Sequence, residues 1–330
     1  MAFTSTWVDR PGPWFKFQDA DVLDEVMLKD FHEAEGKTFE NPDYSVKCVW
    51  DARNYYAVDL FQRIRMSMVN NEKINIVFAS PENHVFMSVV ECLNKYSVSC
   101  RNVEVFFFDE FANEEGNVAP YESAFSKSGQ WMKYFYGRLN PELRMPMEQI
   151  HFWTKENTDT YSELLASYGG ADIIYTNGTW SGLRFIDAET FPAASMEEFL
   201  QMGSRHITLT EDQTCLESLR GMFGASGDIA LVPTCAVTLG PKDIKAAKLH
   251  MDFEFLTSCD GTKNLQKPAL QLAVFGPVCP ENPGSILRLC PGKTYISSTL
   301  QAPTAYPVDA DWLGEAIESI RKAESGKEDK

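Results

Sequence analysis

Two acidic residues stand directly after the most apolar stretch of the sequence. The run FFF at 106–108 leads straight into Asp109 and Glu110. A carboxylate at the end of a buried strand can be partly desolvated, which raises its pKa toward the working range of a general base. Acidic residues at strand ends also often cap the turn or helix that follows. Catalysis and capping are both open for this pair.

Two more loops carry side chains that suit an anionic or sugar ligand. In FASPENH, Ser80, Asn83 and His84 offer hydrogen-bond donors to an anion, although a plain strand-to-helix turn explains the loop equally well. In YTNGTWSGLRFIDAE, Trp180 offers a flat face for stacking on a sugar, and Arg184 offers a fixed cation. Core packing or a surface ion pair is the alternative for each of these two residues.

These loops interrupt a sequence in which strand-like and helix-like segments alternate. Apolar residues near 3.6-residue spacing predict helices, and short β-branched or aromatic runs predict strands. The predicted helices are 20–34, 52–70, 85–97, 160–168, 195–203, 214–223 and a terminal helix over 309–323. The predicted strands lie within 73–84, 101–111, 171–178, 205–210 and 228–240.

The alternation predicts an α/β fold, namely a Rossmann-like open and mostly parallel sheet with helices on both faces. The continuous apolar run at 105–108 suits a strand that is buried on both faces, as in parallel sheets. We expect residues 1–48 to form an N-terminal extension packed on the core, and 49–330 to form one main domain. In such sheets ligands bind outside the carboxyl ends of the strands, where these loops would lie.

Composition excludes several classes of function. The net charge of −17, from 47 acidic and 30 basic residues, disfavours binding to nucleic acids or anionic membranes. No apolar run approaches the ~20 residues of a membrane span, and the first residues do not have the pattern of a signal peptide, so we expect a cytoplasmic protein. The eight cysteines contain no C-x-x-C pair, and neither a Walker loop nor G-x-G-x-x-G is present. We expect no metal and no cofactor.

One pair of motifs resembles a known family. FFFDEF followed by APYES is similar to the "MDEY" strand end and "PESY" segment of the glucosamine-6-phosphate deaminase and sugar-phosphate isomerase family. The resemblance implies the Rossmann-like fold, a phosphorylated sugar as the small-molecule partner, and a homo-oligomer. It also implies that Asp109 moves a proton between C1 and C2 of an open-chain sugar phosphate.

Two other family motifs are altered in this sequence. FASPENH stands where the family has a "PTGGTP" phosphate loop; Ser80 keeps a hydroxyl, but Pro81 removes an amide and no glycine remains. The loop at 175–189 aligns with "GGxGxDGHIAFNEP" and keeps Gly182. Ser181 replaces the aspartate, Leu183 the ring-opening histidine and Ala188 the glutamate that orients it. Since leucine cannot carry a proton, ring opening by an imidazole at this position is excluded.

Phosphate binding is implied at two further residues. LQKPALQLAVFG is similar to the family's "SQKALALQAAVEG", whose lysine binds the substrate phosphate, and it gives that role to Lys267. A lysine at a helix start would act on the same anion as the helix dipole. Arg220 falls within one residue of the family's phosphate-binding arginine.

The leading hypothesis is an enzyme that performs aldose–ketose isomerisation or a deaminase-like reaction on a phosphorylated sugar, with Asp109 as the base. A non-catalytic protein that binds a sugar phosphate or metabolite, or only assembles with partners, is the main rival. Hydrolysis of a sugar-acid lactone, as in the related phosphogluconolactonases, is a third hypothesis. It is disfavoured because that activity also uses a histidine near the altered loop.

Overall fold

The protein is described by a computed structural model over residues 16–79, 81–177, 183–224, 226–255 and 266–301. Its helices are α1 Ala20–Met27, α2 Ala52–Asn70, α3 Asn83–Lys95, α4 Lys127–Tyr134, α5 Tyr161–Ser167, α6 Met196–Phe199, α7 Glu211–Ser218, α8 Pro241–Ala246, α9 Gln266–Phe275 and α10 Ser298–Gln301. Its strands are β1 Tyr44–Val49, β2 Ile74–Phe78, β3 Val103–Phe107, β4 Asp109–Ala112, β5 Ile150–His151, β6 Ile173–Asn177, β7 Arg205–Thr208, β8 Cys235–Thr238, β9 His250–Glu254 and β10 Gly292–Ser297.

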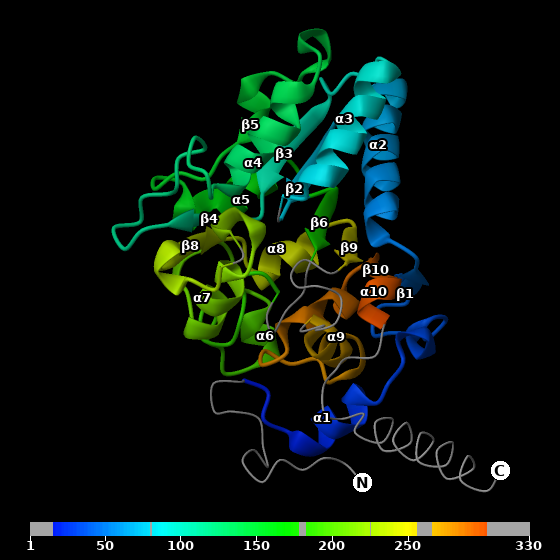
Figure 1. Ribbon diagram of the computed structural model, residues 1–330, viewed down its shortest axis with the longest axis vertical. Helices are drawn as coiled ribbons and strands as arrows, with labels where there is room; N and C mark the ends of the chain where they lie inside the picture. Colours follow the sequence, from blue (N-terminus) through cyan, green and yellow to red (C-terminus); the bar gives the residue numbers. More distant parts are fainter. Residues whose placement is uncertain (1–15, 80, 178–182, 225, 256–265, 302–330) are drawn as a thin grey trace, which may run out of the picture.

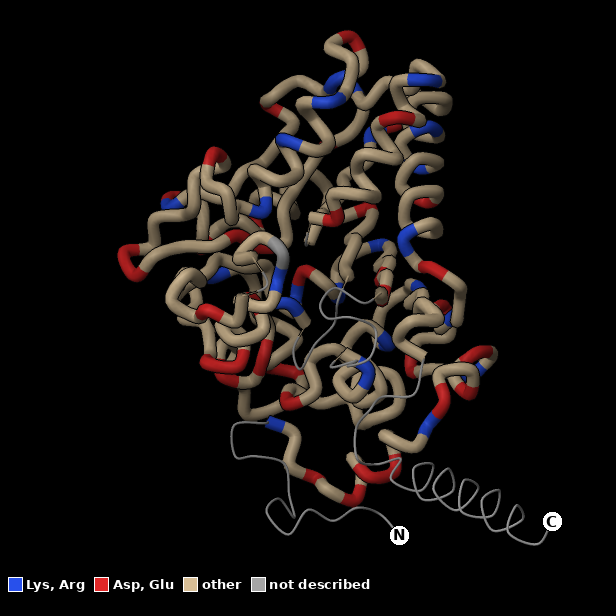
Figure 2. Tube along the Cα trace, viewed as in Figure 1, with Lys and Arg blue, Asp and Glu red and all other residues tan. Residues whose placement is uncertain are grey.

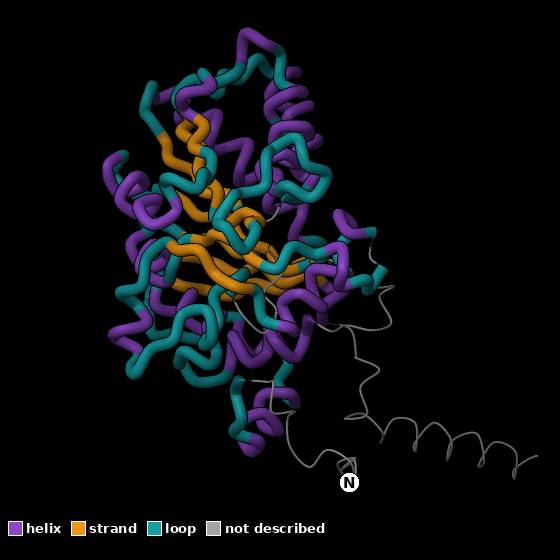
Figure 3. The backbone as a smooth tube through the Cα atoms, turned by 90° about the vertical axis from the view of Figure 1, so that its left-hand side faces the viewer, coloured by secondary structure: helices purple, strands orange, loops and turns teal. Residues whose placement is uncertain are grey.

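The described strands form a parallel main sheet and a smaller antiparallel one. The main sheet has the order β1-β10-β9-β6-β2-β3-β5, and every neighbouring pair in it is parallel. Helices lie on both sides of the strands (Figures 1 and 3). The predicted α/β class and open parallel sheet are therefore confirmed.

The small sheet, β4-β8-β7, was not predicted. The apolar run that reads as a single strand in the sequence is divided at Phe108. The backbone before it stays in the main sheet as β3, and the backbone after it pairs antiparallel with β8 as β4. Asp109 consequently begins a strand of the second sheet, although it still follows the carboxyl end of β3.

The start of the described chain contributes to the main sheet. Strand β1, which the sequence analysis did not predict, pairs in parallel with β10 at the edge of the sheet. Upstream of it, Phe17 and Val26 form a small apolar cluster with Leu272 of α9. Part of the segment expected to be an extension is thus a strand of the core, and Phe17 and Val26 pack on α9. The predicted terminal helix over 309–323 lies outside the described residues.

Helix α2 connects β1 to β2 and is fixed at both ends. The Asp51 side chain accepts a hydrogen bond from the backbone N–H of Arg53 at 3.0 Å, which caps the first turn. Tyr56, Leu60 and Ile64, four residues apart, bury one face against the sheet. The helix ends at Asn71, whose φ of 54° lies in the left-handed region that asparagine tolerates. The predicted helix over 52–70 is confirmed.

A chain of buried polar groups crosses the centre of the sheet. The Thr176 hydroxyl donates to Asp252 Oδ1 at 2.7 Å, and the Thr294 hydroxyl lies 3.3 Å from Oδ2. Asp252 also shares a hydrogen bond with Glu254, two residues along β9. Burial raises the pKa of Asp252 to about 6.

We expect Asp252→Asn to become more stable relative to the unchanged protein as pH rises from about 4 to 7. Because the folded-state pKa of Asp252 is raised, the folded state binds the proton more tightly than the unfolded state. The stabilising contribution of the Asp252 carboxyl is fully present below about pH 4 and is lost as pH rises through about 6. Urea unfolding at several pH values measures the difference. The control Asp159→Asn, at an exposed position, should show the same dependence of stability on pH as the unchanged protein. If Asp252→Asn also shows that same dependence, the pKa of Asp252 is not raised in the folded state.

Candidate functional site

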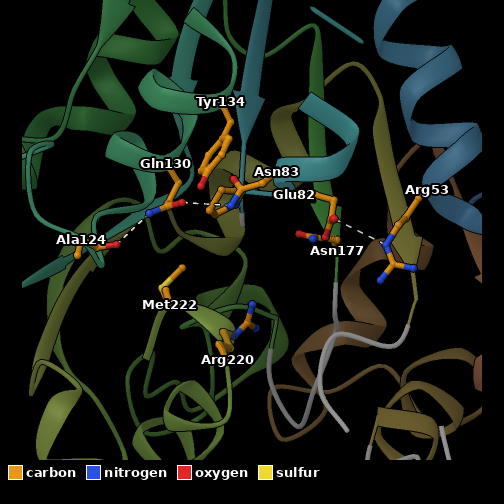
Figure 4. Close-up of a pocket in the computed structure, with 10 residues that line it drawn as sticks. Arg53, Glu82, Asn83, Ala124, Gln130, Tyr134, Asn177, Arg220 and Met222 are labelled. Atoms are coloured by element: carbon orange, nitrogen blue, oxygen red, sulfur yellow. Dashed lines mark hydrogen bonds and ion pairs between the residues drawn. The ribbon is translucent and has the colours of Figure 1, made fainter. Parts of the chain in front are cut away.

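The order of the strands reverses beside β2. After β1 the chain passes to β2, β3 and β5 in one direction across the sheet, and then through β6, β9 and β10 in the other. A crevice is expected outside the carboxyl ends of strands at such a switch point. A cavity of about 450 Å³ lies there, next to the ends of β2 and β6. It is lined by Arg53, Pro81, Glu82, Asn83, Ala124, Gln130, Tyr134, Asn177, Arg220 and Met222 (Figure 4).

A carboxylate and a guanidinium stand together on one wall of this cavity. Glu82 follows β2 at the start of α3, and its Oε1 lies 3.7 Å from Nε of Arg53 in the first turn of α2. The Arg53 guanidinium also lies 4.2 Å from the centre of the Phe255 ring. Burial raises the pKa of the Glu82 carboxyl, against the lowering effect of Arg53. A raised pKa brings a carboxyl closer to the working range of a general base.

Amides and a second arginine form the other walls. The Asn83 amide donates to Gln130 Oε1 at 3.1 Å, and the Gln130 amide donates to the Ala124 carbonyl at 2.9 Å. Arg220 enters from below in Figure 4, and its Nε lies 2.9 Å from Glu217 Oε1. The lining is therefore polar and carries cations on two walls, which suits a hydroxylated anion.

A buried ion pair holds the carboxylate that the sequence analysis selected as base. The side chains of Asp109 and Lys127 are 0% and 2% exposed, and Lys127 Nζ lies 2.6 Å from Asp109 Oδ1. Nζ also lies 3.9 Å from the centre of the Phe185 ring. Burial lowers the pKa of Lys127, and the charge of Asp109 opposes that shift. Asp109 does not line the described cavity.

Arg184 reaches the same carboxylate from the altered loop. Its Nε lies 3.9 Å from Asp109 Oδ2, and its side chain is 2% exposed. Its φ of 61° is in the left-handed region. Burial lowers the pKa of Arg184, although Asp109 raises it. The cation that the sequence analysis assigned to ligand binding or a surface ion pair lies in a buried ion pair.

Glu110 organises the start of α4. Its Oε1 accepts the backbone N–H of Lys127 at 3.0 Å, and its Oε2 accepts the backbone N–H of Ser128 and the hydroxyl of Ser126, each at 2.8 Å. Burial raises the pKa of Glu110, and these hydrogen bonds oppose the shift. Both oxygens thus bind the start of the helix, as expected for the capping alternative.

The other predicted residues are dispersed. Asn83 and Arg220 line the cavity, and His84 is an exposed neighbour on α3. Lys267 lies in the first turn of α9, as expected, but its charge acts on Asp30 near the start of the described chain, and it does not line the cavity. Four predicted residues lie outside the described residues: Ser80, Trp180, Ser181 and Gly182.

Several residues of the cavity wall were not predicted from the sequence. Glu82 could have been predicted as a site residue, because it is acidic and stands in the same strand-end loop as Asn83. Nothing in the sequence marks Arg53 as a site residue, since a charged residue in the first turn of a helix is ordinary. Two further residues, Gln130 and Asn177, reach the cavity only because the sheet order brings α4 and β6 beside β2.

Two further properties hold for the described residues alone. Their His, Cys, Asp and Glu side chains form no group of three that could hold a metal ion. None of their helices has both the length and the apolar character needed to cross a membrane. Figure 2 shows basic residues scattered singly among acidic ones along the chain.

Comparison with known proteins identifies the class of fold. No protein-family model and no curated protein sequence matches the chain. A monomeric glucosamine-6-phosphate deaminase, called the missing link of the NagB superfamily, matches with a TM-score of 0.61 at 15% identity, over 77% of this chain and 98% of that one. 6-Phosphogluconolactonases from Thermotoga maritima and Trypanosoma cruzi each match with a TM-score of 0.52 at 13% identity, over 77% of this chain and 99% and 94% of theirs.

The protein thus has the fold of the NagB superfamily, to which the deaminase belongs. At this level the resemblance found in the sequence motifs is confirmed, with a divergent sequence. Identities of 13–15% establish the fold and not the reaction.

Proposed function

We propose that the protein binds a phosphorylated sugar in the main cavity and moves a proton on its open-chain form, in an aldose–ketose isomerisation or a deaminase-like reaction. The observation that carries this proposal is the position of Glu82. A partly desolvated carboxylate lines a polar cavity at the switch point of the sheet, with Arg53 and Arg220 on its walls. Solved structures with this fold include enzymes named for glucosamine 6-phosphate and 6-phosphogluconolactone.

The phosphate would bind the arginines. In a chain of net charge −17, an anion must be held by local cations rather than by the overall field. Arg220 and Arg53 supply planar donors suited to phosphate oxygens. The side-chain amides of Asn83 and Gln130 would form hydrogen bonds with the sugar hydroxyls.

Proton transfer would follow the usual course through an enediol. Glu82 removes the proton from C2, the electron pair of that C–H bond forms the C1–C2 double bond, and the carbonyl oxygen takes up a proton. Return of the proton to C1, with loss of the O2 proton, gives the ketose. Asp109, the base implied by the motif resemblance, is the competing candidate. Its complete burial against Lys127 favours Glu82.

Ring opening would have to occur before binding. Leu183, in the position of the family's ring-opening histidine, is fully buried and cannot transfer a proton. This favours a substrate that is already open-chain. It also disfavours lactone hydrolysis, which the sequence analysis linked to a histidine near this loop.

We expect Arg220→Gln to weaken the binding of sugar phosphates about 10- to 100-fold, since a charge-assisted contact contributes ~1.5–3 kcal/mol. Thermal stabilisation of the protein by hexose 6-phosphates and glucosamine 6-phosphate measures this loss, because a ligand that binds only the folded state raises its stability. Arg101→Gln, an exposed position away from the cavity, is the matched control and should bind normally.

Two results would count against the proposal. If no sugar phosphate stabilises the unchanged protein, the assignment of the ligand fails. If a sugar phosphate binds but its C2 proton never exchanges with solvent deuterium, the protein is a binding protein that performs no proton transfer.

A further inference from the structure

One of the two arginines of the main cavity stands beside the proposed base. Nε of Arg53 lies 3.7 Å from Oε1 of Glu82, beyond the range of a direct hydrogen bond. Figure 4 shows both side chains on the same side of the cavity, whereas Arg220 enters from below. Among the described residues that line the cavity, Glu82 is the single carboxylate. Arg53 is therefore the arginine placed where the proton is to be removed.

The distance between these two side chains fits two adjacent atoms of a substrate. In an open-chain aldose the carbonyl oxygen O1 lies about 2.4 Å from C2, as the lengths of the C–C and C=O bonds require. A carboxylate that reaches the C2 proton and a guanidinium that reaches O1 must then stand close together without pairing tightly. The 3.7 Å between Arg53 and Glu82 meets this condition.

The protein holds the Arg53 side chain in place. Its guanidinium lies 4.2 Å from the centre of the Phe255 ring, in a cation–π contact. The residue belongs to the first turn of α2, a helix of 19 residues whose N-terminus carries a partial positive charge. The Asp51 cap accepts its backbone N–H at 3.0 Å. Donors fixed in this way stabilise a developing negative charge without rearranging during the reaction.

A carbonyl oxygen suits this position better than a phosphate. A phosphate bound to Arg53 would bring its negative charge next to the Glu82 carboxylate, and like charges side by side oppose binding. A carbonyl oxygen is neutral when it binds and becomes negative only as the C2 proton leaves, so its contact with Arg53 is strongest in the transition state. The carboxylate beside Arg220 belongs to Glu217, which does not line the cavity. Arg220 is thus the better phosphate ligand.

We propose that Arg53 is a catalytic residue that binds O1 of the substrate and stabilises the enediolate, while Arg220 binds the phosphate. This role rests on the proposed function and divides the work of the two arginines. Glu82 takes the C2 proton, the electron pair of that C–H bond forms the C1–C2 double bond, and the π electrons of the carbonyl move to O1 beside Arg53. The O2 proton passes to O1, the carbonyl forms at C2, and Glu82 returns its proton to C1. The guanidinium keeps its own protons throughout.

Opposite effects of two substitutions test this division of roles, with glucosamine 6-phosphate and hexose 6-phosphates as ligands. In Arg53→Gln, exchange of the C2 proton at saturating ligand should fall about 10²- to 10³-fold, the effect of removing one such donor, while thermal stabilisation by the same ligand persists. In Arg220→Gln the stabilisation should weaken, while exchange at saturation persists. Arg65→Gln, at an exposed position on the same helix as Arg53, is the matched control and should change neither.

Arg53→Lys separates binding of O1 from the effect of the charge on Glu82. Burial raises the pKa of Glu82, and the charges of Arg53 and His84 oppose that shift, while Asp51 adds to it. Arg53→Gln should therefore move the rise of the exchange rate to higher pH, and the rates are compared above the rise in every variant. Lysine keeps the charge but not the planar pair of donors. Arg53→Lys should keep the pH of the rise and still exchange more slowly than the unchanged protein.

Three results would overturn the role of Arg53. If Arg53→Gln weakens binding as Arg220→Gln does and leaves exchange at saturation intact, Arg53 is a second phosphate ligand. If Arg53→Gln changes neither binding nor exchange, Arg53 takes no part in the site. If the unchanged protein binds sugar phosphates and never exchanges the C2 proton, the proposed function fails and the role of Arg53 fails with it. The Arg53 side chain is 35% exposed, so its substitution should leave the fold intact.

Discussion

Replacing Glu82 by Gln is expected to slow exchange of the C2 proton of a bound sugar phosphate by roughly 10²- to 10⁴-fold, the usual contribution of a positioned acid–base group. Glutamine keeps the size of the side chain, so thermal stabilisation by the same ligand should survive. In the unchanged protein the rate should rise with pH as Glu82 loses its proton. Because burial raises the pKa of this carboxyl, that rise should lie above the range of an ordinary glutamate. Deuterium incorporation measured by mass spectrometry or NMR follows the exchange.

Asp109→Asn is the comparison that decides between the two carboxylates. With Glu82 as the base, Asp109→Asn should alter stability far more than it alters exchange per folded molecule. If Asp109→Asn abolishes exchange while Glu82→Gln leaves it intact, the base is Asp109, as the motif resemblance implies. The buried pair with Lys127 would then have to open when the substrate binds.

Replacing Lys127 by Met is expected to lower the free energy of unfolding by ~3–5 kcal/mol. The substitution leaves Asp109 as a buried carboxylate without its 2.6 Å partner, and breaking a buried ion pair on one side has a cost of this size. Urea unfolding at neutral pH measures the loss. Lys133→Met, at an exposed position on the same helix, should change stability by no more than ~0.5 kcal/mol.

The double variant Lys127→Met/Asp109→Asn separates pairing from packing. Because Asp109→Asn also takes the carboxylate from Arg184, 3.9 Å away, the double variant is compared with both single variants. If Lys127 acts through its pair with Asp109, the double variant should lose less stability than the sum of the two single losses. Additive losses would mean that Lys127 contributes by contact with the rings of Phe111 and Phe185 instead.

The regular elements of this fold were predictable wherever they follow their own periodicity. Helix α2 could be read from the spacing of Tyr56, Leu60 and Ile64, because one buried face imposes that spacing on any helix. The alternation of apolar and polar residues in β1 is too short to identify a strand from the sequence. This segment becomes a strand because it pairs with β10. The break at Phe108 was not visible because the chain stays buried from Val103 through Ala112, so no exposed turn residue marks it.

The site was predicted less completely than the fold. The strand-end rule led to Asn83, and the motif resemblance led to Arg220; both line the cavity. The rule also selected Asp109 and Glu110, whose side chains lie in a buried ion pair and at the start of α4 and do not line this cavity. A sequence records that a carboxylate follows a strand, but whether it meets a ligand, a lysine or backbone amides depends on what the fold brings opposite.

By itself the sequence determined the alternating strands and helices and the acidic net charge, since the first depends on residues that are neighbours along one chain segment and the second on composition alone. The tertiary structure alone decided which polar groups share a cavity. The cavity brings together residues that are far apart in the chain, namely Arg53, Glu82, Asn177 and Arg220. They meet beside the point where the order in which the chain adds strands to the sheet reverses, between β2 and β6. Strand order is set by the packing of the whole sheet and by no local pattern of residues.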